Sequence, residues 1–329
     1  MKAPVLSLNE DKTNRLSKLI EKSHDSYMDL NSILPWENGV NRSIAPKRED
    51  HSWIYGTPYW DALTPEQRIE LLWLENAQTT AGFIWLEEGL SPLFIRLLHK
   101  YDGQIPEPIR EYMMIFCKEE IVHTQMFRRY LTIAGLPVYQ RPEMMDFILE
   151  VEKMHPIAGI LCTYLMEGTA EEAAMRQEGP GIDPLTRQLY SEHHREEARH
   201  LAFGKWICES FFEKASMQTK MQIGALVRPY MSTVIPRFTY NPEISQYLSF
   251  DIGIDPSDTA EIARIRVSEN NRRVNAERYG PMLAWIKKLG IVDESYDWFD
   301  PITAPPPKAM AVSGVVAPGP ALQQPAAAS

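Results

Sequence analysis

From Pro65 onward, the sequence contains long segments of helical periodicity separated by short breaks that contain proline or glycine. Helices are expected at about 65–100, 106–135, 142–154, 157–178, 184–215, 217–237 and 258–290, with two or three helices in the last two regions. No stretch shows the sustained two-residue alternation of a half-buried strand. The pattern therefore predicts an all-α protein whose helices are long enough to form a bundle.

The two ends of the chain differ from this helical part. A short amphipathic helix is expected at about 9–23, and the segment that follows, up to residue 60, is irregular and rich in aromatic side chains. The last 29 residues contain seven prolines and eight alanines, and this composition predicts disorder. The expected division is therefore an N-terminal segment at 1–60, a bundle domain at 61–300 and a disordered tail at 301–329.

Composition limits the functions that the chain can have. Its 44 acidic residues outnumber its 34 basic residues, and this excess argues against broad binding to a nucleic-acid backbone. No run approaches the roughly 18 apolar residues of a membrane span, and the N-terminus lacks the apolar core of a signal peptide. The three cysteines lack the spacing of a disulfide framework or a zinc site. We therefore expect a cytoplasmic protein that binds neither nucleic acid nor membranes.

The pair Glu-x-x-His, which places both side chains on one face of a helix, occurs four times. Random order would give roughly 0.7 copies, so some of these pairs are incidental. Two copies have an additional glutamate, for which the chance expectation is about 0.07 copies. These two copies are Glu119-Glu120-Ile121-Val122-His123 and Glu196-Glu197-Ala198-Arg199-His200. The pairs without it, expected to be solvated or at a helix end, are Glu21/His24 and Glu152/His155.

A lone glutamate precedes each extended motif by about thirty residues. Glu87 lies 33 residues before Glu120, and Glu167 lies 30 residues before Glu197. Both lone glutamates interrupt apolar runs, where a carboxylate is costly to bury unless it is paired or bound to a metal. Glu88 is an alternative to Glu87, because the sequence does not show which of the two faces inward.

These residues together predict a dinuclear metal site inside the bundle. Four carboxylates nearly neutralise two divalent cations, and imidazoles complete the coordination without adding charge. Glu119 and Glu196 are candidates to accept the remaining N–H of a metal-bound histidine. His193 lies on the same helical face as Glu197 and His200 and is a candidate third imidazole, although its spacing alone favours a position outside the ligand set.

The order of these residues resembles the p-aminobenzoate N-oxygenase (AurF-like) family of ferritin-like diiron proteins. The segment HHREEARH at 193–200 is similar to the His-x-Arg-acid-Glu-x-x-His pattern of that family, and the similarity extends over about residues 60–290. The resemblance implies a ferritin-like bundle with flanking helices. The metal ligands that it implies are Glu87, Glu120, His123, Glu167, His193, Glu197 and His200.

The resemblance also implies a function. Two iron ions would activate O2 with electrons from an external donor, which is a separate protein or a small reductant, and the enzyme would be a homodimer. The substrate would be an amine, commonly an arylamine oxidised to a hydroxylamine, nitroso or nitro product in antibiotic or other natural-product biosynthesis. Two alternatives remain open. One is a diiron enzyme that acts on carbon by hydroxylation, desaturation or C–C cleavage, and the other is a non-catalytic metal-binding or radical-generating subunit.

Three other features near these motifs bear on the site. The family would supply a cation near its C-terminal helix for the carboxylate of a benzoate, but residues 279–285 contain no arginine. The sequence therefore predicts a substrate other than a simple benzoate, although Arg278 lies close by.

Glu171 is interpreted either as a proton relay or as a solvated residue, and Tyr164 as a residue near the metal or as a packing residue.

Overall fold

The computed structural model describes residues 4–141, 151, 155–175, 179–239 and 242–296. Within these ranges the chain consists of helices and turns without any strand, which confirms the predicted all-α class. Most of the helix expected at about 142–154 and the whole tail at 301–329 lie outside the described residues.

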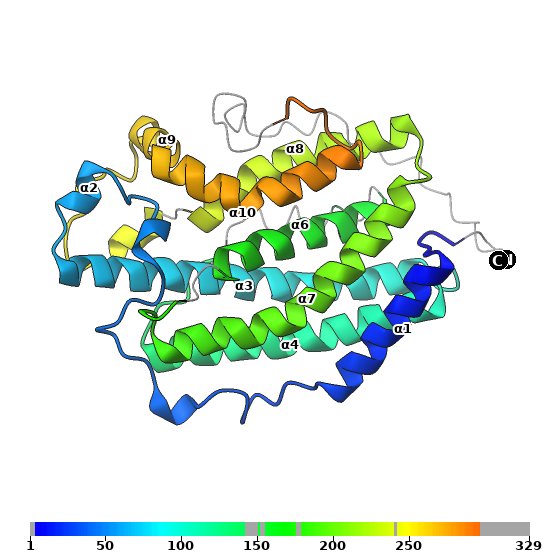
Figure 1. Cartoon of the computed structure of the whole chain (residues 1–329), viewed down its shortest axis with the longest axis horizontal. Coiled ribbons are helices and arrows are strands. Elements are labelled where there is room, and N and C mark those ends of the chain that lie inside the picture. Colours follow the sequence, from blue (N-terminus) through cyan, green and yellow to red (C-terminus); the bar gives the residue numbers. More distant parts are fainter. Residues whose placement is uncertain (1–3, 142–150, 152–154, 176–178, 240–241, 297–329) are drawn as a thin grey trace, which may run out of the picture.

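Four long helices form the bundle, and their bounds lie close to the predicted ones. They are α3 (Pro65–Lys100), α4 (Glu107–Ala134), α6 (Pro156–Met175) and α7 (Pro184–Phe212). The most extensive helix contacts pair α3 with α4 and α6 with α7, and the first of these pairs runs along the length of the molecule (Figure 1).

Local sequence signals explain where these helices begin and end. The hydroxyl of Thr64 accepts a hydrogen bond from the backbone N–H of Gln67, whose side chain bonds back to Thr64 and completes a capping box at the start of α3. Gly135 ends α4 in the left-handed conformation, with φ 61°. Asp183 caps α7 by accepting from the backbone N–H of Thr186 at 2.9 Å.

Further helices surround the bundle. They are α1 (Glu10–Asp25), η1 (Trp36–Asn38), η2 (Glu49–His51), α2 (Pro58–Asp61), α8 (Met217–Thr239), η4 (Pro242–Gln246), α9 (Thr259–Arg266) and α10 (Glu269–Lys288). α1 packs on α4 and α7, whereas α8 and α10 both pack on α6 (Figure 1). No helix in the described ranges combines enough length and apolar character to cross a membrane.

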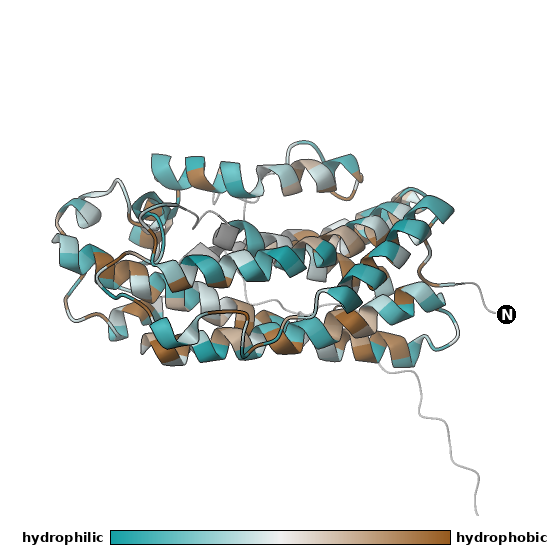
Figure 2. Cartoon of the chain, turned by 60° about the horizontal axis from the view of Figure 1, so that its bottom comes forward, coloured by the Kyte–Doolittle hydropathy of each residue, from teal (hydrophilic) through white to brown (hydrophobic). Residues whose placement is uncertain are grey.

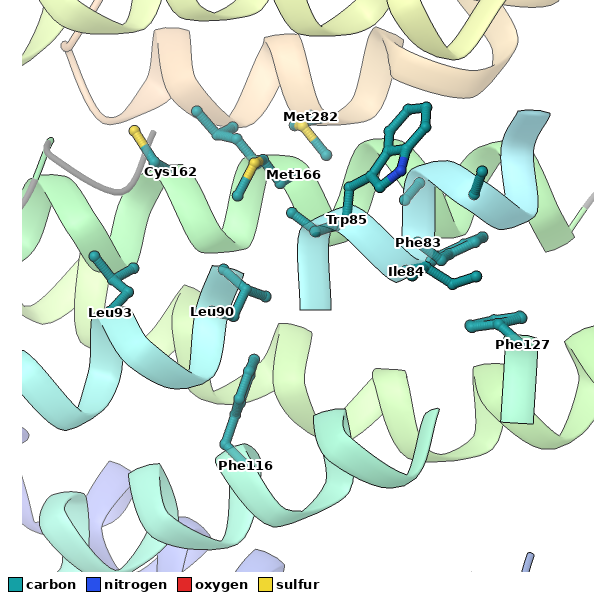
Figure 3. Close-up of a cluster of buried hydrophobic side chains, with 14 of the residues drawn as sticks. Phe83, Ile84, Trp85, Leu90, Leu93, Phe116, Phe127, Cys162, Met166 and Met282 are labelled. Carbon is teal, nitrogen blue, oxygen red and sulfur yellow. The ribbon is translucent and has the colours of Figure 1, made fainter. Parts of the chain in front are cut away.

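Hydrophobic and hydrophilic residues alternate around the helices, as expected for helices that bury one face (Figure 2). Two aromatic pairs join α3 to α4: Phe83 with Phe127, and Phe94 with Phe116, at ring-centroid distances of 4.9 and 4.7 Å. Phe116 also projects toward Leu90 of α3 (Figure 3). The two pairs lie at different levels of the bundle, and the predicted ligand residues of α3 and α4 fall between them in the sequence.

Candidate metal centre

The two Glu-Glu-x-x-His motifs meet inside the bundle. Glu120 and His123 of α4 and Glu197 and His200 of α7 each offer a ligand atom, and these four atoms lie within 4.8 Å of one another. All four side chains are buried. Because each Glu-x-x-His pair shares one helical face, the packing of α4 beside α7 is enough to bring both motifs together.

The two histidines of these motifs present the same ring nitrogen to the shared carboxylates. Nδ1 of His200 lies 2.8 Å from Glu120 and 3.1 Å from Glu197, and Nδ1 of His123 lies 3.2 Å from Glu197. Their Nε2 atoms point the opposite way, so Nδ1 is the nitrogen available to a metal.

The extra glutamate of each motif contacts the histidine of the other motif. Nε2 of His200 on α7 donates to Glu119 on α4 at 2.8 Å, and Nε2 of His123 on α4 donates to Glu196 on α7 at 2.9 Å. The structure thus places both glutamates where a carboxylate fixes the orientation of a metal-binding imidazole. Their effect on metal binding stays a prediction.

His193 lies in the same cluster. It forms a second group of neighbouring ligand atoms with Glu87 and His123. Its Nε2 is 3.2 Å from Glu87 and 3.3 Å from Glu197, and its side chain has no exposed area. These contacts exclude a surface position for His193, whereas its role as a ligand stays a prediction.

The structure also distinguishes Glu87 from its neighbour Glu88. Glu87 is buried and accepts a hydrogen bond from the hydroxyl of Thr124 at 3.2 Å. Glu88 is exposed and pairs with Arg128 on the surface. Glu87 is therefore the member of the pair that faces the cluster.

Glu167 completes the set of buried carboxylates from α6, but it lies outside both close groups of ligand atoms. Neither of its oxygens has a hydrogen-bond partner among the described residues. Burial, together with the negative charges of Glu197 and Glu120, raises its pKa well above the ordinary value. These charge interactions indicate that Glu167 faces the cluster.

The donor set fits a pair of metal ions. Four buried carboxylates, from Glu87, Glu120, Glu167 and Glu197, carry four negative charges when ionised, and three of them, all but Glu87, have at least one oxygen without a hydrogen-bond partner among the described residues. Both oxygens of Glu120 also lack a hydrogen-bond partner within the described part of the chain. Two divalent cations would supply the missing charge, and carboxylate oxygen with imidazole nitrogen suits iron or manganese.

The electrostatics of the cluster reflect this excess of carboxylates. Burial opposes the charged form of His193, yet the charge of Glu197 and the contact with Glu171 raise its pKa to about 9. Burial raises the pKa of Glu87 to about 7, and the charge of Glu120 acts in the same direction. A metal that binds to these groups must therefore displace protons.

Two further buried residues contact the site: the sequence left Glu171 open between a proton relay and a solvated residue, and it did not predict Arg199. Glu171 lies one turn after Glu167, contacts His193 Nδ1 at 3.4 Å and also pairs with His194. Its burial rules out the solvated interpretation. Arg199 lies within the second motif and pairs with Glu119 at 2.9 Å. The sequence signal that could have pointed to Arg199 is its place three residues after Glu196, a spacing at which side chains on a helix meet.

Several other candidates lie outside the cluster. Tyr164 packs against Trp285, with ring centroids 4.5 Å apart, which favours its packing interpretation. His24 is exposed near Glu111, and His155 packs on Phe211, so neither histidine joins the site. Glu152 lies outside the described residues.

α10 contains three arginines before residue 279, and they differ in their exposure. Arg272 and Arg273 are exposed, whereas Arg278 is buried in α10. The charge of Arg278 acts on His51 and Lys47. This arrangement places its charge beside the N-terminal segment.

Comparison with known proteins adds the family. The family model of the p-aminobenzoate N-oxygenase AurF matches residues 9–290, which is most of the chain. The chain belongs to the AurF family. Membership confirms the resemblance and makes the chain an oxidoreductase of the diiron oxygenase and oxidase type, in a ferritin-like fold. Among curated proteins, none matches the chain.

One solved structure with a similar arrangement is a variant of an R2-like ligand-binding oxidase with an aerobically reconstituted Mn/Fe cofactor. It is 16% identical, with a TM-score of 0.45, and the match covers 79% of this chain and 93% of the oxidase.

Proposed function

We propose that this member of the AurF family is an O2-dependent N-oxygenase that holds two iron ions. Its substrate is an amine, in the first place an arylamine, and its product is a hydroxylamine, nitroso or nitro compound. The observation that carries the proposal is the buried position of His193, whose Nε2 faces Glu87 and Glu197. A third imidazole is the feature that links the sequence to amine oxygenation rather than to other diiron chemistry.

Seven side chains would hold the metal ions: Glu87, Glu120, His123, Glu167, His193, Glu197 and His200. Iron held there would offer open coordination positions for O2 and would pass on the electrons that reduce it. The first oxygenation is balanced when the amine and O2 take up two electrons and two protons, giving a hydroxylamine and water. The two electrons come from an external reductant, which is a separate protein or a small molecule.

The residues around the ligands exclude water and fix the imidazoles. Phe83 and Phe127 pack edge-on against His193, with ring centroids 4.8 and 4.9 Å from it. Phe116 packs on His200 with ring centroids 4.0 Å apart. A dry site of this kind protects a reactive oxidant from side reactions with solvent.

A direct assay tests the proposal. Iron-loaded, chemically reduced protein is mixed with aryl and alkyl amines, 4-aminobenzoate among them, under ¹⁸O2, and the products are identified by mass spectrometry. We expect ¹⁸O on the nitrogen of at least one arylamine, with a substrate other than 4-aminobenzoate preferred. Labelled oxygen on carbon, desaturation, or turnover of no amine would contradict N-oxygenation.

A variant of His193 connects the activity to the site. His193→Ala leaves six candidate ligands, so we expect two-iron binding to persist while the optical and Mössbauer spectra change and amine oxygenation falls. Glu88→Gln is the control, because Glu88 is exposed and faces away from the cluster. An unchanged iron spectrum in His193→Ala would remove this histidine from the ligand set.

A further inference from the structure

A buried ion network lies beside the candidate ligands. Its three charged members, Arg199, Glu119 and Glu196, each expose only 2–3% of their area. A single guanidinium nitrogen, Nη2 of Arg199, lies 2.9 Å from Oε1 of Glu119 and 3.3 Å from Oε1 of Glu196. The guanidinium of Arg199 therefore pairs with two buried carboxylates that come from different helices.

Each of these carboxylates has its second oxygen on a histidine of the cluster. Oε2 of Glu119 accepts from His200, and Oε2 of Glu196 accepts from His123. The contacts thus form a continuous path from one histidine through a carboxylate, Arg199 and the other carboxylate to the second histidine. Replacing Arg199 would therefore affect the orientation of both imidazoles.

The remaining donors of Arg199 fix its plane. Its Nε donates to the hydroxyl of Ser23 at 3.0 Å, and its Nη1 donates to the backbone carbonyl of Arg195 at 3.4 Å. Ser23 is fully buried near the end of α1. A lysine could not replace this pattern, because a single ammonium group lacks the planar fork that reaches three directions.

α1 is itself held firmly on the bundle. Leu16 and Ile20 of α1 are buried in the core. Lys12 of α1 contacts Glu209 at 3.3 Å and Ser210 at 3.2 Å, both on α7. The hydrogen bond from Arg199 to Ser23 therefore connects the centre to an anchored helix, which lies before the four-helix core in the sequence.

We propose that Arg199 is a positioning residue that couples His123 and His200, and that α1 belongs to the scaffold of the metal centre through Ser23. The inference rests on the proposed dinuclear site. Without the guanidinium, both carboxylates would lose their shared buried counterion and would no longer be held in the positions from which they orient the two imidazoles. Metal affinity should then fall at both metal positions together.

The test is an anaerobic titration of the metal-free protein with Fe²⁺ against a competing chelator. Loss of a partner of this kind typically weakens metal binding about 10–100-fold. We expect a decrease in that range for both equivalents in Arg199→Met, little recovery in Arg199→Lys, and a smaller decrease in Ser23→Ala. Arg195→Met is the matched control, because this arginine lies one turn earlier on α7 with an exposed side chain.

A double-mutant cycle tests the coupling directly. With Arg199 present, the decrease in Fe²⁺ affinity of the double variant, Glu119→Gln with Glu196→Gln, should differ by at least about threefold from the product of the two single-variant decreases. The two effects are coupled because both carboxylates pair with Arg199. In the Arg199→Met background the two effects should multiply. If Arg199→Met fails to fold, as judged by circular dichroism, the same cycle is measured in Arg199→Lys.

The outcomes separate this inference from the proposed function. Wild-type protein that binds no iron would contradict the dinuclear site itself. Wild-type protein that binds two equivalents, together with unchanged affinity in Arg199→Met or independent effects of the two glutamines, would overturn only the role of Arg199. Unchanged affinity in Ser23→Ala would remove α1 from the scaffold.

Discussion

Each of the three histidines in the cluster has a carboxylate on both sides of its ring. One nitrogen faces the candidate ligands, and the other faces a carboxylate outside the ligand set: Glu196 for His123, Glu119 for His200 and Glu171 for His193. Such a partner selects the tautomer and fixes the ring plane, so that the ligating nitrogen is ready before the metal arrives.

The partner of His193 gives a prediction for a single residue. Glu171→Ala should leave the fold intact, weaken Fe²⁺ binding about 10–100-fold and shift the iron spectrum in the same direction as His193→Ala. Glu171→Gln should recover part of the effect, since its amide oxygen still accepts a hydrogen bond.

His194→Ala is the control for this experiment, because it removes the more exposed partner of Glu171 and leaves His193 in place. Metal affinity and spectrum should both stay near the wild-type values. Equal effects of the His194 and Glu171 variants would show that Glu171 acts in some other way than by orienting His193.

The raised pKa values of His193 and Glu87 predict how pH affects the metal-free protein. Both groups hold a proton more tightly in the folded chain than in the unfolded chain, with pKa values of about 9 and about 7. The stability that they contribute is therefore complete at low pH and is lost as pH rises through those values. For His193, this amounts to about 3 kcal/mol.

Denaturant unfolding at pH 6 and pH 9 measures this effect. Metal-free protein should be less stable at pH 9, whereas iron binding should strengthen with pH, because bound histidines must be deprotonated. Metal-free stability that rises between pH 6 and pH 9 would contradict the assigned directions of these pKa shifts.

At this scale the sequence predicted most of the cluster, together with Glu119 and Glu196 beside its histidines, but not the contacts of Glu171 and Arg199. Glu120, His123, Glu197 and His200 were identified from helical spacing, because spacing fixes which side chains share a face. The partners of Glu171 and Arg199 lie on other turns or other helices, so their contacts depend on how the helices rotate against one another. Periodicity in one helix does not contain that information.

At the scale of helices, a glycine determines how closely α8 approaches the segment after α10. A Cβ atom at Gly224 would lie 1.9 Å from the backbone carbonyl oxygen of Ile291, and a backbone atom cannot move away cheaply. Gly224→Ala should therefore destabilise the protein by about 1–3 kcal/mol.

Gly181 provides the matched control, because a Cβ atom there meets nothing within 4 Å and its φ is not in the positive range. Gly181→Ala should be neutral or slightly stabilising, by up to about 1 kcal/mol. Thermal or denaturant unfolding of both variants measures the difference. Equal stabilities would show that α8 can shift without cost.

Helix ends were predictable where a cap has a side-chain signature. Thr64 and Pro65 marked the start of α3, and Gly135 marked the end of α4, each within one residue of the structure. The region expected at 258–290 forms two helices, α9 and α10, which Ser268 separates by capping the second. Residues 268–273 contain no apolar side chain, so apolar spacing does not fix where one helix ends and the next begins.

For the whole molecule, much of the negative charge lies inside the bundle. Among the described residues, nine acidic but only three basic side chains are buried, and the ligand carboxylates and their partners are enclosed by α3, α4, α6 and α7. Enclosing so many carboxylates without cations would be strongly unfavourable. The bundle is therefore expected to be most stable with its metal bound, since ligands that bind only the folded state stabilise it.

The number of metal ions per chain tests the central claim most directly. Protein produced with iron, or reconstituted anaerobically with Fe²⁺ and freed of loosely bound metal, is analysed for iron and for protein concentration. The two groups of ligand atoms that share His123, together with the carboxylate of Glu167, predict close to two iron ions per chain. A value near zero or one after complete reconstitution would contradict the dinuclear centre.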